Sequence, residues 1–148
     1  MLLAGCASTP TPKPSADYPQ ARAQIQQRLN EIFDAAEKKD LDRLDSYHLY
    51  GPKFSKFAGE TFSRQDAATS RQGEHDGLGT INNLSMKADD LKIDLFGDVG
   101  IATFVLNYSF KQGTDTVEKK ARSTMVFVNE SGAWKIAHEH FSTPKSNP

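Results

Sequence analysis

Two histidines near the end of the chain have the spacing and the chemistry of a functional pair. Residues 132–142 read GAWKIAHEHFS, in which a turn glycine precedes a pattern typical of a short strand. Alternate residues of a strand point to the same face, so His138 and His140 are predicted to share a side with Trp134, opposite Glu139. Histidine titrates near neutral pH and can serve as base, acid or hydrogen-bond donor. We expect at least one of the two to line a pocket; a structural histidine bonded to the backbone or to an arginine is the alternative.

Arg122 and Asn107 are the candidates for binding the polar end of a ligand. Arg122 falls in the strand before the last one, and an arginine that faces into a cavity is costly unless it meets an anion. An ordinary surface charge is the alternative. Asn107 and Tyr108 are neighbours in one strand, so only one of them can face inward. Trp134 is expected in the core or on a pocket wall that stacks on a ligand.

The stretch from residue 47 to 62 is rich in aromatic side chains. Such a stretch favours an apolar pocket lining, with plain packing between helix and sheet as the alternative. Phe54 and Phe57 are predicted to enclose a ligand. Tyr47 or Tyr50 could donate a hydroxyl hydrogen bond that polarises a carbonyl group.

Other polar residues give weaker indications of catalysis or metal binding. Asp66 fits a helix cap, and Asp90 and Asp94 fit solvent-facing strand positions, although each could be a catalytic carboxylate. A metal site needs a third ligand beside the two strand histidines, and the other histidines of the chain are His48 and His75. We therefore expect neither a metal nor a cofactor.

The bulk composition limits the class of protein. The chain has 148 residues, enough for one domain, with 37% hydrophobic residues and a formal charge of -1. A nucleic-acid-binding protein would show a basic stripe, so no nucleic-acid partner is expected. No apolar run reaches the roughly 18–20 residues that a membrane span needs, and a single cysteine excludes an internal disulfide.

That cysteine belongs to an N-terminal motif. The chain begins MLLAGCAS, and Leu-Ala-Gly-Cys is similar to the lipobox of bacterial lipoproteins, in which a signal peptide is removed and lipid is attached to the cysteine sulfur. The Pro-, Ser- and Thr-rich residues 9–19 would form an extended tether. Five residues precede Cys6, fewer than the roughly 7–15 apolar residues of a signal peptide. A start codon placed too late, a trimmed chain or a chance match explains this shortness.

The lipobox resemblance implies lipidation of Cys6 and a periplasmic location. The residue after the cysteine is Ala7, and a residue other than Asp there usually sends such proteins to the outer membrane, which would hold the anchor. The membrane would then be contacted only through the lipid anchor. Without a lipobox, the alternative is a cytoplasmic protein.

Between a tether at residues 1–17 and a flexible tail at 144–148, residues 18–143 show helical patterns followed by strand patterns. Helices are expected over about 19–39, just after Asp40, and over about 63–71, with a polar, glycine-rich loop at 73–79. From about residue 84 the period becomes that of strands joined by short turns, which indicates an antiparallel meander. This order predicts an α+β fold with helices packed on one face of a curved sheet that surrounds a cavity.

Together with the segment RSTMVF at 122–127, this layout and the ending G-x-W-x-x-x-H-x-H-x-S resemble a known family. It is the SnoaL-like branch of the nuclear transport factor 2 (NTF2-like) superfamily, which also contains ketosteroid isomerase. The ending is also similar to the association domain of calcium/calmodulin-dependent protein kinase II, where cavity arginines hold small carboxylates, and Arg122 is similar in kind. The resemblance covers residues 18–142 and implies a cone with a pocket, usually dimeric through its sheet.

The resemblance implies no single activity, because members include isomerases, dehydratases and oligomerisation modules. The leading interpretation is a small-molecule-binding domain on a lipoprotein tether, with an apolar or carboxylate-bearing ligand in the cone. One alternative is an isomerase or dehydratase with a histidine base and Tyr47 or Tyr50 as the hydroxyl donor. Another is a homodimeric assembly module whose outer sheet face includes Phe141.

Overall fold

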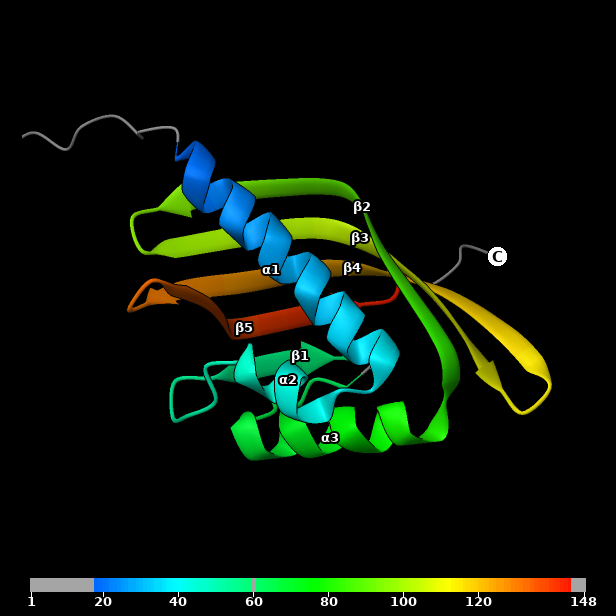
Figure 1. The fold of residues 1–148 in the computed structure, drawn as a ribbon. Coiled ribbons are helices and arrows are strands. Elements are labelled where there is room, and N and C mark those ends of the chain that lie inside the picture. Colours follow the sequence, from blue (N-terminus) through cyan, green and yellow to red (C-terminus); the bar gives the residue numbers. More distant parts are fainter. Residues whose placement is uncertain (1–17, 60, 145–148) are drawn as a thin grey trace, which may run out of the picture.

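The chain folds as helices packed against a curved five-stranded sheet, which confirms the predicted α+β class (Figure 1). The computed structural model describes residues 18–59 and 61–144, so Cys6, the tether at 1–17 and residues 145–148 of the predicted tail lie outside the described residues. The helices are α1 (Pro19–Lys38), α2 (Leu41–Ser46) and α3 (Ala67–Thr80), and the strands are β1 (Ser55–Ala58), β2 (Asn82–Phe96), β3 (Val99–Gln112), β4 (Asp115–Glu130) and β5 (Ala133–Ser142). No helix in the described ranges is both long and apolar enough to cross a membrane.

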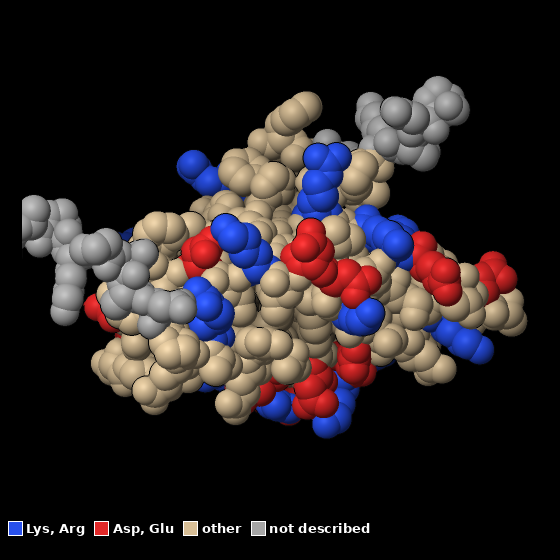
Figure 2. All heavy atoms as spheres, turned by 90° about the horizontal axis from the view of Figure 1, so that it is seen from above, with Lys and Arg blue, Asp and Glu red and all other residues tan. Residues whose placement is uncertain are grey.

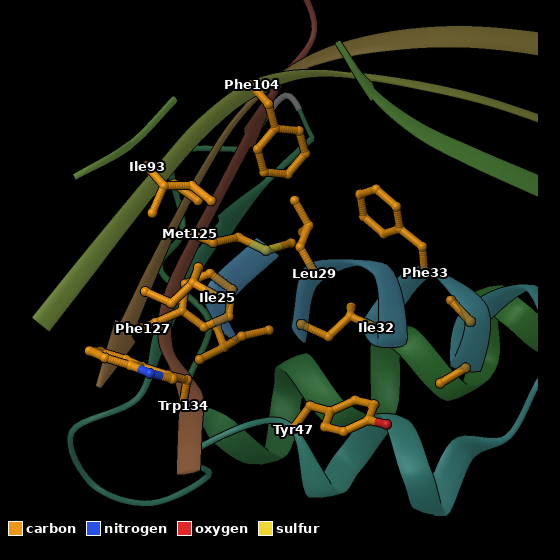
Figure 3. Packing of buried hydrophobic residues seen from close by; sticks show 14 of the residues in the cluster. Ile25, Leu29, Ile32, Phe33, Tyr47, Ile93, Phe104, Met125, Phe127 and Trp134 are labelled. Carbon is orange, nitrogen blue, oxygen red and sulfur yellow. The ribbon is translucent and has the colours of Figure 1, made fainter. Parts of the chain in front are cut away.

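Helix α1 provides the main helical contribution to the core. Its buried side chains recur at helical spacing and face the sheet, including Ile25, Leu29 and Phe33. Figure 3 shows Ile25 and Leu29 pointing from α1 toward Met125 and Phe127 of β4. The concave face of the sheet, defined here as the face that packs on α1, therefore carries the hydrophobic core.

The prediction of a loop at residues 73–79 is wrong, because these residues form the second half of α3. Asp66 caps this helix, accepting a hydrogen bond from the Thr69 backbone N–H at 2.8 Å, as predicted. Three glycines disfavour a helix by up to about 1 kcal/mol each relative to alanine. Polar contacts to other elements offset that cost: Arg71 Nε lies 2.6 Å and His75 Nε2 3.0 Å from the carboxylate of Asp45.

The sheet has the strand order β1-β5-β4-β3-β2, and β2 to β5 form the predicted antiparallel meander. The short strand β1 was not predicted, and it pairs with β5 in parallel. In Figure 1, α1 crosses the sheet while α2 and α3 lie near β1.

A β-bulge interrupts the last strand. Val126 pairs with His138 but its neighbour Phe127 pairs with Ile136, so Ala137 has no partner on β4. An extra residue reverses the alternation of faces beyond it. As a result, the side chain of Glu139 takes the same face as that of Ile136.

Acidic and basic side chains are interspersed on the face of the molecule seen from above (Figure 2). This face shows no continuous stripe of one sign.

Candidate ligand-binding site

A cavity of about 250 Å³ lies between α1, α3 and the concave face of the sheet. Its wall is mainly apolar and includes Ile32, Phe33, Leu78, Met86, Leu106 and Met125. Besides the phenol of Tyr108, the polar part of the lining consists of four ionisable side chains, named here the buried ion cluster: His48, Lys56, Glu74 and Glu139. An apolar cavity with a few convergent polar groups is the usual form of a small-molecule site.

Four separate segments supply the buried ion cluster. Lys56 of β1 lies opposite Glu139 of β5 in the parallel register. His48 follows α2 and forms a backbone bridge with Ile136, just before the bulge. Glu74 comes from α3, and the Tyr50 hydroxyl donates a hydrogen bond to its Oε2 at 3.2 Å. The bulge is essential to this assembly, because it turns Glu139 toward the cavity.

Two cationic side chains face the same two carboxylate oxygens within the cluster. The Lys56 ammonium contacts Oε1 of Glu74 and lies 3.0 Å from Oε2 of Glu139. The His48 Nε2 atom lies 3.8 Å from that Glu74 oxygen and 3.6 Å from that Glu139 oxygen. Two acids and two bases thus balance in charge when His48 is protonated.

The ring of His48 is held in one orientation. Its Nδ1 lies 3.0 Å from the carbonyl oxygen of Leu44 and must carry a proton, because a carbonyl can only accept. The ring stacks on Tyr50 with centroids 4.7 Å apart and meets the edge of Phe54 at 5.9 Å. Its Nε2 is therefore the atom whose protonation state can change.

The surroundings shift the titration of the cluster. Burial opposes protonation of His48, but Glu139 and Glu74 outweigh it and raise the His48 pKa above 6.5. Burial would raise the Glu139 pKa, yet Lys56 and His48 hold that pKa well below its usual range. For Lys56, the two carboxylates overcome burial and raise the pKa. Burial, and then Glu74, raise the Tyr50 pKa, which keeps its hydroxyl protonated.

Two buried atoms of the cluster lack a hydrogen bond. Among the described residues, His48 Nε2 and Glu139 Oε2 have no partner with hydrogen-bond geometry, although Lys56 lies at ion-pair distance from the latter. Their side chains are 1% and 4% exposed. Buried polar atoms are nearly always satisfied in folded proteins. The Lys56 ammonium at 3.0 Å compensates Glu139 Oε2, so His48 Nε2 is the atom of the cluster that points to a missing partner.

His48, Glu74 and Glu139 could also serve as metal ligands, because their ligand atoms lie within 4.8 Å of one another. The Lys56 ammonium, however, contacts both carboxylates. A divalent cation at that place would have to displace a buried lysine whose pKa is raised. The donor set therefore fits a lysine better than a metal.

The bulge separates the histidines of β5 from the cavity. His138 and His140 lie on the outer face, opposite Trp134, so the predicted shared face is wrong. His138 Nδ1 is 2.9 Å from Ser55 Oγ, and the ring of Phe57 meets both histidines edge-on with centroids 6.3 Å away.

Arg122 and Asn107 also lie away from the cavity. The Arg122 side chain is exposed, and its backbone lies opposite Ser142 in the pairing of β4 with the end of β5. Asn107 donates a hydrogen bond from Nδ2 to Asp89 Oδ2 at 2.8 Å and lines a separate surface hollow. The predicted grouping of Arg122 and Asn107 with the β5 histidines around one cavity is therefore not formed.

The predicted aromatic residues divide between packing and the site. Trp134 is buried in the core and donates from Nε1 to Gln24 at 3.1 Å. The Tyr47 hydroxyl accepts a hydrogen bond from Arg43 at 2.7 Å, which is a packing role. Phe54 and Tyr50 lie against His48, beside the cavity. Phe141, predicted on the outer face, lines the cavity instead.

The acidic candidates on β2 have local roles. Asp94 accepts a hydrogen bond from Lys92 at 2.6 Å. Asp90 has a φ of +52° within an irregularity in the pairing of β2 with β3. Neither lines the cavity.

Sequence reasoning missed the buried ion cluster. A weak signal was present: Lys56 lies between Phe54 and Phe57, and a charged residue at such a position is seldom buried unless paired. The face of Glu139 depends on a bulge that the alternation pattern does not reveal.

Comparison with known proteins agrees with this architecture. The model of the SnoaL-like domain family matches residues 25–146. No curated protein matches the chain. Among solved structures, a candidate dehydratase of the NTF2-like family from Streptomyces avermitilis superposes with a TM-score of 0.79, at 16% identity over 86% of this chain and 99% of that one.

Two other solved structures have the same fold. A candidate scytalone dehydratase from Novosphingobium aromaticivorans has a TM-score of 0.75 and 12% identity, covering 85% of each chain. The kinase II hub homology domain from Chlamydomonas reinhardtii has a TM-score of 0.69 and 15% identity, covering 84% of this chain and 99% of that one. The family match shows that the chain belongs to the SnoaL-like domain family, and the shared fold is that of the NTF2-like structures.

Proposed function

We propose that this domain binds a small, mainly apolar molecule in the cavity, with the polar group of that molecule held by the buried ion cluster. The observation that carries the proposal is the buried His48 Nε2 atom, which has no hydrogen-bond partner among the described residues, in a side chain that lines an apolar cavity beside the Glu139 carboxylate. A bound polar group would satisfy this atom and could also donate to Glu139.

The energetics of the cluster support a role in binding rather than in stability. Replacing a buried ion pair by well-packed apolar residues is often neutral or stabilising. Four ionisable groups at one cavity are therefore a costly way to fill the core. Groups with strongly perturbed pKa values in a cavity are typical of functional sites.

Native mass spectrometry of the full chain tests the proposal. We expect a small molecule to accompany the folded protein and to be lost in His48→Phe. The matched control is His138→Phe, on the outer face, which should retain the molecule. An empty wild-type protein that also shows no thermal stabilisation by any member of a library of small apolar alcohols, ketones and acids would contradict the proposal.

A second candidate function is acid–base catalysis of an isomerase or dehydratase type, favoured by the geometry of His48. Its ring is oriented by Leu44, its Nε2 lies 3.6 Å from Glu139, and its pKa is raised. Two structural neighbours are described as candidate dehydratases. Time-dependent loss of water from cyclic hydroxy-ketones, abolished in His48→Phe and retained in His138→Phe, would establish this function.

The lipoprotein anchor and the homodimer belong to the same proposal. A lipid on Cys6 would tether the domain to the periplasmic side of the outer membrane, and membrane extraction of wild type and Cys6→Ser compares the two states.

Assembly through the outer sheet face is supported by the likeness to a hub homology domain. Light scattering gives the oligomeric state, and a dimer with an unoccupied cavity would favour the assembly role.

A further inference from the structure

We infer that the ligand is a neutral molecule about the size of one ring, whose hydroxyl group bridges His48 Nε2 and Glu139 Oε2. This inference rests on the proposed binding function and specifies the chemistry of the ligand.

His48 Nε2 and Glu139 Oε2 have opposite hydrogen-bonding character, and Oε2 keeps a second lone pair beside its contact with Lys56. The Nδ1 proton of His48 is engaged by Leu44, so a protonated His48 presents one free donor at Nε2. The Glu139 carboxylate presents an acceptor 3.6 Å away. This separation exceeds the roughly 2.7–3.2 Å of an N–H···O bond, so the two atoms do not satisfy each other. A hydroxyl can accept from one and donate to the other at the same time.

Charged ligands fit the cluster poorly. A carboxylate would approach Glu74 and Glu139, and their nearest cation, Lys56, contacts both of them. An ammonium group would approach Lys56 and His48. Arg122, which favoured a carboxylate-bearing ligand in the sequence, lies outside the cavity. The balanced charges of the cluster therefore favour a neutral polar group.

The volume limits the size of the ligand. Pockets for drug-sized molecules measure about 300–1,000 Å³, and this cavity measures about 250 Å³. Apart from the cluster, its wall consists largely of apolar side chains such as Phe33, Leu106 and Met125. One substituted ring with a single polar group matches both the volume and the wall.

Three probes of one shape test the inference by calorimetry on the full chain: 4-ethylphenol, 4-ethyltoluene and 4-ethylbenzoate. We expect 4-ethylphenol to bind at least tenfold more tightly than either of the others at pH 6. Equal or tighter binding of the hydrocarbon or the carboxylate would overturn the inference while leaving the binding function intact. Failure of all three to bind would also overturn the inference, and the native mass spectrometry and library screen described above would then decide whether the binding function fails with it.

Variants locate the preference at the cluster. In His48→Phe, the tenfold advantage of the phenol over the hydrocarbon should disappear, because the donor is lost. Glu139→Gln is the second variant in case the first does not fold, and it should reduce the advantage by removing the charged acceptor. The matched controls, His138→Phe and Glu118→Gln, alter side chains outside the cavity and should keep the full advantage. An advantage that persists in both cluster variants would overturn the bridging role.

Discussion

Lys56 of β1 and Glu139 of β5 face each other across a parallel strand pair, with Nζ 3.0 Å from Oε2. This contact joins the edge of the sheet to the cavity, because Glu139 also faces His48 and Lys56 also contacts Glu74 of α3. One pair of residues thus links strand β1, helix α3 and the candidate site.

Lys56→Met should destabilise the protein strongly. Removing the ammonium leaves Glu74 and Glu139 facing each other as buried carboxylates, and breaking a buried pair costs about 3–5 kcal/mol. Urea unfolding measures the loss of unfolding free energy. The exposed Lys87→Met is the control and should change stability by less than about 0.5 kcal/mol. Adding Glu139→Gln to Lys56→Met should recover part of the loss; no recovery would show that charge is not the cause.

The stability of the protein should pass through a maximum between about pH 5 and 6. The pKa of Glu139 is lowered from 4.5, so its stabilising contribution is present above pH 4.5 and is lost as the pH falls through the folded-state value. The pKa of His48 is raised from 6.5, so its contribution is present below pH 6.5 and is lost as the pH rises through the folded-state value. Urea midpoints from pH 3 to 9 measure both limbs.

His48→Phe separates the two limbs of that profile. This variant should lose the decrease in stability that the histidine causes at alkaline pH. It should keep the decrease in stability that the carboxylates cause at acidic pH. His138→Phe should keep the profile of the wild type. An alkaline decline that is unchanged in His48→Phe would assign it to another group.

The sequence predicted the fold well because the fold depends on local periodicity. The apolar stripe of α1 and the alternation of apolar and polar residues at 91–95 in β2 each report their element directly. The second half of α3 was missed because its glycines are compensated by tertiary contacts, such as that of His75 with Asp45, which are not visible in the sequence.

The candidate site was harder to predict because it depends on one bulge and one parallel pairing. Strict alternation from Trp134 places His138 inward, whereas the extra residue Ala137 places Glu139 inward. The partner of Glu139 lies on β1, more than eighty residues earlier in the chain. Neither the bulge nor the parallel pairing produces a periodic pattern in the sequence.

Deletion of Ala137 should be tolerated, whereas deletion of Lys135 should not. Without Ala137, Ile136 and His138 become neighbours opposite Phe127 and Val126, so every other side chain of β5 keeps its face. Without Lys135, Trp134 or Ile136 must leave the core, which costs about 3 kcal/mol or more. Unfolding followed by the fluorescence of Trp134 measures both. Equal losses would show that the bulge does not set the faces.

Alanine at two glycines should have opposite effects on stability. Gly73 lies inside α3 with no atom near the position of a Cβ, so Gly73→Ala should raise the unfolding free energy by about 0.5–1 kcal/mol. A Cβ on Gly100 of β3 would collide with Cδ1 of Ile25, so Gly100→Ala should lower it by about 1–3 kcal/mol. Urea unfolding compares the two variants with the wild type. Hydrogen exchange of the α3 amides should slow in Gly73→Ala alone, because Ser70 is the fully buried residue of α3 and the helix makes few apolar contacts, so a gain in helix propensity has a local effect. A destabilising Gly73→Ala would mean that α3 is not a continuous helix in solution.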